Sequence, residues 1–365
     1  MNGTPLPLED YALLDDANCA DRIRAAKMAL GDRCVILGHH YQRDEVFTHA
    51  DLTGDSLRLS REASQSKAEY IVFCGVHFMA EVADILSRPD QVAILPDLAA
   101  GCSMADMANR AAVERAWEEL QTVLDPDAAI TPVTYINSAA DLKAFCGRHG
   151  GIVCTSSNAR DILEWSFARR EKVLFFPDQH LGRNTGYRMG IPLDAMVTWD
   201  FSKPLGGLEP EAIRAARMIL WKGFCSVHQV FQPAHIDRFL ERHPETQVIV
   251  HPECALEICE KADVIGSTEF ILKAVRAAEP GTRWLVGTEL NMVNRLADEM
   301  RPKGVDVHFM SPTVCMCSTM FRTDPQHLAW ILENLVQGHV VNRISVPESV
   351  AEPARLSLER MLDVA

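Results

Sequence analysis

Short apolar runs that alternate with helical patterns constrain the fold of this chain more than any other feature. Each run is followed by a polar or glycine-containing turn and then by residues with helical spacing, as at 80–86 and 159–170. Continuous runs of valine, isoleucine and leucine between helices predict parallel strands that are buried on both faces. The sequence therefore predicts an α/β protein built of three-layer αβα sandwiches with parallel sheets.

The αβ unit occurs three times along the chain, which predicts three pseudo-threefold-related αβα domains around a central site. A segment at 181–222 has no counterpart in the other two units and is rich in proline and glycine. We interpret it as an insertion on the surface that ends in a helix at 211–220. The expected limits are an N-terminal extension at 1–20, a first domain at 21–125 on which a C-terminal helix packs, further domains at 126–235 and 236–345, and a C-terminal tail or helix at 346–365.

Composition excludes several classes of function. The net charge of −14 argues against nucleic acid or an anionic membrane as a partner. No apolar run approaches the roughly 18 residues of a transmembrane helix, and the N-terminal residues lack the pattern of a signal peptide. The 11 cysteines are scattered through apolar runs, which suits buried thiols in a reducing cytoplasm rather than a disulfide framework.

Three Cys-Ser steps follow apolar runs at equivalent points of the three units, at Cys102, Cys225 and Cys317. A lone cysteine is more often a small buried hydrophobic residue, but the repetition favours three thiolates that converge on one metal site with an open position. Cys315 competes with Cys317, and we choose Cys317 because a serine follows it, as in the other two steps. Three thiolates and a water would also suit zinc, so a zinc enzyme stays an alternative.

Polar side chains follow the apolar runs, at the carboxyl ends of the predicted strands where parallel sheets bind ligands. His251 and Glu253 form a pair suited to acid–base chemistry or to binding a polar substrate, and strand-end capping is an equally weighted structural interpretation. His39 and Tyr41 share one side of an extended segment, so we expect both in the central cavity. Further polar groups at strand ends are Tyr135, Asn137, Ser156 and the glycine–hydroxyl turns that contain Ser56 and Thr268.

A series of motifs in one order resembles the quinolinate synthase family, in its longer form. The resemblance covers nearly the whole chain, from about residue 33 to residue 335, and the number of ordered motifs makes it specific. The family's architecture is similar to the one expected above, with three αβα domains around a central site. The motifs are GHHYQ, ADLTGDSLRLSREA, GCSMADM, YINS, CTSSNA, FPDQHLG, WKGFCSVH, HPEC, GST, GTE and CSTM.

The resemblance implies a [4Fe–4S] cluster bound by Cys102, Cys225 and Cys317, with one iron left open to substrate. It implies a transferase of NAD biosynthesis that condenses iminoaspartate with dihydroxyacetone phosphate, with loss of phosphate and water, to give quinolinate. An aspartate-oxidising enzyme would supply the iminoaspartate. On this resemblance, His39, Tyr41 and Glu253 are expected to transfer protons. The substrate-binding residues that it implies are His39, Ser56, Tyr135, Asn137, Ser156, His251, Glu253 and Thr268.

The chain departs from some members of the family near the end of the third unit, where CMC stands in place of CxxCxxC. A function of another class, a non-catalytic binding protein of αβα lobes, is also compatible with the strand pattern. The lack of a signal-peptide pattern and the three thiols argue against that alternative. Colour separates the metal alternatives, because zinc sites are colourless and iron–sulfur sites are brown.

Overall fold

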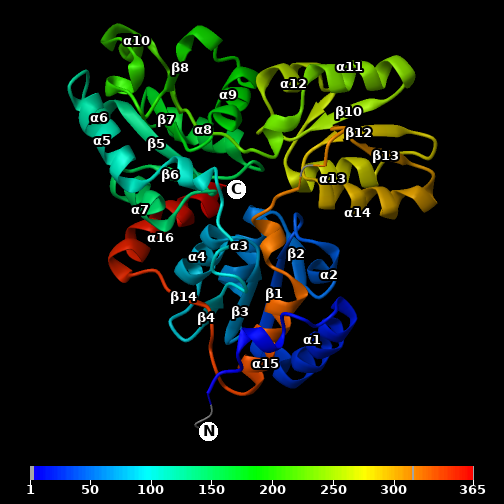
Figure 1. Ribbon diagram of the computed structural model, residues 1–365. Helices are drawn as coiled ribbons and strands as arrows, with labels where there is room; N and C mark the ends of the chain where they lie inside the picture. The colour runs from blue at the N-terminus through cyan, green and yellow to red at the C-terminus, as the bar shows by residue number, and fades with distance from the viewer. Residues whose placement is uncertain (1–3, 315, 365) are drawn as a thin grey trace. The chain divides into compact units, whose positions relative to one another are not determined.

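The computed structural model describes residues 4–314 and 316–364, and the chain forms two compact units. The first unit holds one β-sheet and the second unit holds two, each flanked by helices (Figure 1). The first unit combines Met1–Cys102 with Met316–Val346, and the second combines Ser103–Cys315 with Pro347–Ala365.

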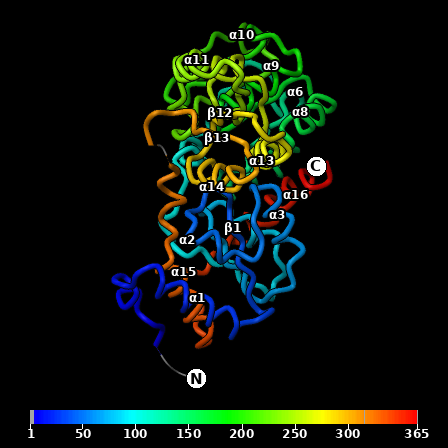
Figure 2. The backbone as a smooth tube through the Cα atoms, turned by 90° about the vertical axis from the view of Figure 1, so that its right-hand side faces the viewer, coloured from blue at the N-terminus to red at the C-terminus, as the bar shows by residue number. Residues whose placement is uncertain are grey.

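The first unit is built on a five-stranded sheet in the order β14-β4-β3-β1-β2, which is parallel except for β14. Helices α1 and α15 lie on one face of the sheet and α3 on the other (Figures 1 and 2). Ile36 and Val72 of the inner strands pack with Ile23 of α1 and Leu332 of α15 in the core. The elements are η1 (Leu8–Asp10), α1 (Asp16–Leu30), η2 (Gly31–Arg33), β1 (Cys34–His39), α2 (Asp44–Phe47), β2 (Leu52–Gly54), α3 (Ser56–Gln65), β3 (Tyr70–Cys74), α4 (His77–Leu86), β4 (Val92–Ile94), η8 (Met320–Arg322), α15 (Pro325–Val336) and β14 (Arg343–Ile344).

The second unit holds two parallel sheets, with the strand orders β6-β5-β7-β9-β8 and β11-β10-β12-β13. The elements of the first of these sheets are η3 (Ala105–Met107), α5 (Arg110–Gln121), α6 (Pro126–Ala129), β5 (Ile130–Tyr135), α7 (Ala140–Arg148), β6 (Ile152–Cys154), α8 (Ala159–Phe167), β7 (Lys172–Phe176), α9 (Gln179–Arg188), η4 (Leu193–Ala195), β8 (Met196–Trp199), η5 (Pro204–Gly207), α10 (Pro210–Ala215), β9 (Met218–Trp221) and the C-terminal helix α16 (Glu348–Val364). Those of the second are η6 (His228–Val230), α11 (Pro233–Arg242), β10 (Gln247–Val250), α12 (Leu256–Lys261), β11 (Val264–Ile265), α13 (Thr268–Arg276), β12 (Arg283–Gly287), α14 (Leu290–Met300), η7 (Arg301–Lys303) and β13 (Asp306–Phe309).

Polar caps fix where the helices that follow the strand ends begin. Asp55 accepts a hydrogen bond from a backbone N–H of α3 at 3.0 Å, and Ser267 accepts one from α13 at 3.3 Å. Asp178 accepts one from α9 at 2.7 Å. Each cap satisfies an N–H group that a helix N-terminus leaves without an intrahelical partner. The strand-to-helix turns, on which the candidate site residues stand, are therefore held in one conformation.

The helix predicted at 211–220 is present but shorter than expected, and the prediction is wrong for its second half. Helix α10 ends at Ala215, and Met218–Trp221 form β9, an inner strand that pairs with β7 on one side and β8 on the other. Four consecutive apolar residues fit a buried helical turn or a buried strand equally well, and hydrogen bonding to two neighbouring strands decides for the strand. The segment at 181–222 thus contributes β8 and β9 to the sheet and is not only a surface excursion.

The predicted fold class is confirmed, because three mostly parallel sheets are flanked by helices. Each of the three αβ units predicted from the sequence supplies the parallel strands of one sheet. The limits of the three domains stay a prediction. Among the described helices, none has the length and apolar character that crossing a membrane requires.

The contact between α7 and α16 yields a stability prediction. A Cβ atom at Gly147 would lie 1.8 Å from the backbone oxygen of Pro353, so only glycine allows the two helices to approach this closely. We expect Gly147→Ala to lower the free energy of unfolding by about 1–3 kcal/mol, the usual cost of overpacking, despite the better helix propensity of alanine. The measurement is the urea midpoint of the variant. Arg148→Ala, at the exposed next position of α7, is the control and should leave the midpoint nearly unchanged. A midpoint of Gly147→Ala at or above that of the wild type would contradict the close contact.

Candidate functional site

The three cysteines predicted as ligands share one local structure. Cys102, Cys225 and Cys317 are each half-buried, and an exposed serine follows each of them. A 3₁₀ turn begins three residues after each cysteine, as η3, η6 and η8. The carbonyl groups of Cys225 and Cys317 accept hydrogen bonds from the N–H groups four residues further on, at 3.2 and 3.0 Å. The shared conformation supports the choice of Cys317, whereas its rival Cys315 lies outside the described residues.

The other described cysteines have a different environment. Burial raises the pKa of each of these thiols, which keeps them protonated and unsuited to metal binding at neutral pH. They behave as small hydrophobic residues of the cores. They are the half-buried Cys34 and the buried Cys19, Cys74, Cys146, Cys154, Cys254 and Cys259.

Glu253, in the turn after β10, is the centre of a buried polar network in the second unit. It stands three residues after the last residue of β10 and is 3% exposed. Its Oε1 atom accepts a hydrogen bond from the hydroxyl of Tyr135, at the end of β5, at 2.6 Å. Its Oε2 atom lies 2.9 Å from Nδ1 of His228. The ring of His228 stacks on that of His251 with 4.6 Å between centroids, and its Nε2 atom lies 3.3 Å from Oγ1 of Thr288. The ends of β5 and β10 and the turn after Cys225 therefore meet at one carboxylate, and Thr288, after β12, joins them through His228.

The electrostatics of this network keep Glu253 ionised. Burial alone would raise the pKa of Glu253, but the charge of the neighbouring His228 and the hydrogen bond from Tyr135 outweigh burial and hold the pKa well below its usual range. Burial lowers the pKa of His251 to about 3 against the opposing effect of Glu253, so His251 is neutral at pH 7. The nearby contacts with His228 and Tyr135 are therefore the main cause of the ionised state that we assign to Glu253.

A second carboxyl group, that of Asp178, belongs to the same buried region. It is fully buried at the end of β7, and burial, assisted by the charge of Glu253, raises its pKa well above the usual range. Sequence reasoning missed Asp178 and His228 as site residues. The signal for His228 was its place three residues after Cys225 in the CSVH motif. Asp178 lies in the FPDQHLG motif, directly after an apolar run, and its place at a strand end is the signal that could have found it.

Cys225, His228 and Glu253 could together hold a metal ion. One ligand atom of each, the sulfur, an imidazole nitrogen and a carboxylate oxygen, lie within 4.8 Å of one another. These are donor types that bind zinc and iron in proteins.

The residues predicted in the first unit also lie at strand ends. The ring of His39 is buried, and it meets the ring of Tyr41 edge to face with 4.7 Å between centroids. The backbone N–H of Tyr41 donates to Nδ1 of His39 at 3.1 Å, which leaves the proton of the neutral imidazole on Nε2. Gly54, at the end of β2, pairs with His39 of β1 in the parallel register. Ser56, two residues after Gly54, is the first residue of α3.

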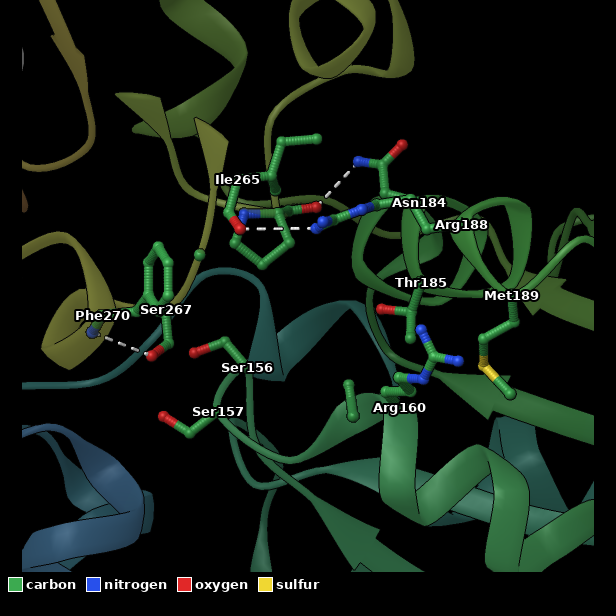
Figure 3. Close-up of a pocket in the computed structure, with 13 residues that line it drawn as sticks. Ser156, Ser157, Arg160, Asn184, Thr185, Arg188, Met189, Ile265, Ser267 and Phe270 are labelled. Atoms are coloured by element: carbon green, nitrogen blue, oxygen red, sulfur yellow. Dashed lines mark hydrogen bonds between the residues drawn. The ribbon is translucent and has the colours of Figure 1, made fainter. Parts of the chain in front are cut away.

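The remaining predicted residues lie in the second unit, and some of them lie at a pocket shown in Figure 3. Ser156 lines this pocket, as does Ser267, the residue before Thr268. Thr268 itself is buried at the first position of α13. Asn137 is half-buried in the turn after β5, two residues beyond Tyr135. The structure thus brings Tyr135, His251 and Glu253 together, and Ser156 and Thr268 belong to the strand ends on either side of the pocket.

Comparison with known proteins gives the family of the chain. The family model described as quinolinate synthetase A protein matches residues 21–363. The chain is 55% identical over 359 residues to the quinolinate synthase of Herpetosiphon aurantiacus, with 98% of this chain and 95% of the relative covered. It is 56% identical over 361 residues to that of a Nocardioides species, with 97% and 91% covered. It is 50% identical over 359 residues to that of Geobacillus thermodenitrificans, with 98% and 96% covered. The chain belongs to the quinolinate synthase family.

Proposed function

We propose that the protein condenses iminoaspartate with dihydroxyacetone phosphate to quinolinate, with loss of phosphate and water, in the cytoplasm. It would act as a transferase in NAD biosynthesis, after an aspartate-oxidising enzyme that supplies iminoaspartate. The observation that carries the proposal is the identical setting of three half-buried cysteines, each three residues before a 3₁₀ turn, in a chain of the quinolinate synthase family.

The same setting supports a [4Fe–4S] cluster as the cofactor. We propose Cys102, Cys225 and Cys317 as its ligands. All three are partly accessible, in contrast to the buried thiols of the cores, and thiolates are the ligands that iron–sulfur clusters require. When bound with one iron open, such a cluster supplies a Lewis acid for the loss of water.

The side chains of the protein would hold the reactants and move protons. Glu253 is held in place by Tyr135 and His228, and we propose that it takes a proton once the substrate displaces one of these partners and weakens their hold on its charge. The protonated Nε2 of His39 and the hydroxyl of Tyr41 are suited to donate one. The residues that we propose to bind the carboxylates and the phosphate are His39, Ser56, Tyr135, Asn137, Ser156, His251, Glu253 and Thr268.

A zinc enzyme is the second candidate, favoured by the metal-binding potential of Cys225, His228 and Glu253. Both oxygens of Glu253 already have partners, Tyr135 on one side and His228 on the other. A metal bound to Nδ1 of His228 would have to replace the contact between that atom and Glu253. We therefore prefer a cofactor held by cysteines, with His228 and Glu253 beside it.

The cofactor proposal predicts the metal content of the protein. Prepared without oxygen, the protein should be brown and contain about four irons and four sulfides per chain. Replacement of Cys102, Cys225 or Cys317 by serine should remove most of the iron and the visible absorption in each case. Cys34→Ser, at another half-buried cysteine, should keep both. A colourless protein with one zinc would support the alternative, and a full cluster in Cys317→Ser would show that this ligand is wrong.

The proton-transfer roles predict the kinetics of two variants. Tyr41→Phe removes one hydroxyl group, and Glu253→Gln removes a charge while keeping the shape of the side chain. We expect each to lower kcat by about 10²-fold or more, the usual effect of losing an acid–base group, with unchanged iron content. Tyr187→Phe, at an exposed tyrosine of α9, is the control. A raised KM at unchanged kcat would instead make Tyr41 and Glu253 binding residues only.

A further inference from the structure

The pocket in Figure 3 has a chemical character that the proposed proton transfers do not use. It lies within the second unit, has a volume of about 230 Å³ and is formed by the start of α8, the end of α9 and the turn before α13. Two arginines, Arg160 and Arg188, line it, and no aspartate or glutamate is among the described residues that do so. Hydroxyl groups complete the polar lining, and those of Ser156 and Ser267 point toward each other across it (Figure 3).

A cationic pocket is notable in this chain because the net charge is −14. A small anion approaching such a protein meets a repulsive field unless a local concentration of positive charge offsets it. Arg188 donates one of its N–H groups to the backbone oxygen of Ile265 at 3.3 Å, which holds the guanidinium group at the pocket. Arg160 lies 3.0 Å from Glu164 on the solvent side of α8, and an exposed pair of this kind is weak enough for an anion to replace it.

The pocket is continuous with the backbone of the candidate active site. Pro252, between His251 and Glu253, lines it. Asn184, also in its wall, donates to the backbone oxygens of Pro252 and Cys254, both at 2.8 Å. A ligand in the pocket would therefore lie one residue from the polar network around Glu253.

We propose that this pocket is an access site for the anionic reactants, in which Arg160 and Arg188 bind a small dianion on its way to the active site. The inference rests on the proposed function, since it assigns the pocket to that reaction. The volume of about 230 Å³ is many times the roughly 10–15 Å³ that a single water needs on this measure, which leaves room for a three-carbon phosphate ester or a four-carbon dicarboxylate. Both carry the paired oxygens that a guanidinium group binds with two hydrogen bonds.

Steady-state kinetics of Arg160→Gln, Arg188→Gln and the double variant test the proposal. We expect KM to rise roughly tenfold for each single variant, the scale of one charge-assisted hydrogen bond, with unchanged kcat and iron content. Rising salt should raise the wild-type KM more than that of the double variant. Arg188→Lys should recover only part of the affinity, because lysine offers no planar fork. Arg238→Gln, at an exposed position of α11 outside the pocket, is the matched control and should behave as the wild type.

The KM values of the two proposed substrates, measured separately, show whether the pocket binds the phosphate ester or the dicarboxylate. A KM increase for dihydroxyacetone phosphate alone assigns the pocket to the phosphate ester, and an increase for iminoaspartate alone assigns it to the dicarboxylate. Unchanged KM values for both, or a loss of kcat at unchanged KM, would overturn the proposal. If the wild type makes no quinolinate, the proposed function fails, and calorimetric titration with dihydroxyacetone phosphate and with malate still tests the pocket. Equal binding of both by the wild type and the double variant would then refute it.

Discussion

The organisation of the second unit depends on how the carboxylate of Glu253 is satisfied in the protein interior. A buried carboxylate without partners lowers the stability of the fold by several kcal/mol. Side chains from other segments of the chain must therefore contact it. Tyr135 does so from the end of β5, which belongs to one sheet, and Glu253 stands at the end of β10, which belongs to the other. His228 does so from the turn after Cys225. One buried charge thus fixes two sheets and the loop of a candidate ligand relative to one another.

Fixing Glu253 in this way also decides what chemistry it can perform. The hydrogen bond from Tyr135 and the neighbouring His228 hold the pKa of Glu253 well below neutral pH, so its carboxyl group is ionised at pH 7 and has no proton to donate. Asp178, buried at the neighbouring strand end β7, has its pKa shifted in the opposite direction by burial and by Glu253. Two carboxyl groups with opposed shifts in one region are typical of sites that need both protonation states at one pH.

The described cysteines form two groups, one that packs in the cores and one of candidate metal ligands. Seven described thiols are held protonated by burial or partial burial and pack as small hydrophobic residues, for example Cys74 in β3 and Cys154 in β6. Cys102, Cys225 and Cys317 instead stand in turns, half-accessible, with the same spacing to a 3₁₀ turn. The charges are also unevenly distributed. In a protein of net charge −14, the described residues that line one pocket include two arginines and no carboxylate.

The sequence by itself determined the features that depend on local pattern. Continuous apolar runs between helices gave the parallel sheets, and the repeated Cys-Ser steps singled out three turns that proved to share one conformation. The ordered motifs gave the family. Tertiary structure alone decided that Met218–Trp221 are a strand, because four apolar residues fit either state until hydrogen bonds to β7 and β8 form. It alone brought His228 and Asp178 to Glu253 and joined Arg160 and Arg188 in one pocket. These contacts link residues far apart in the chain, and their energies come from burial and pairing that no local pattern records.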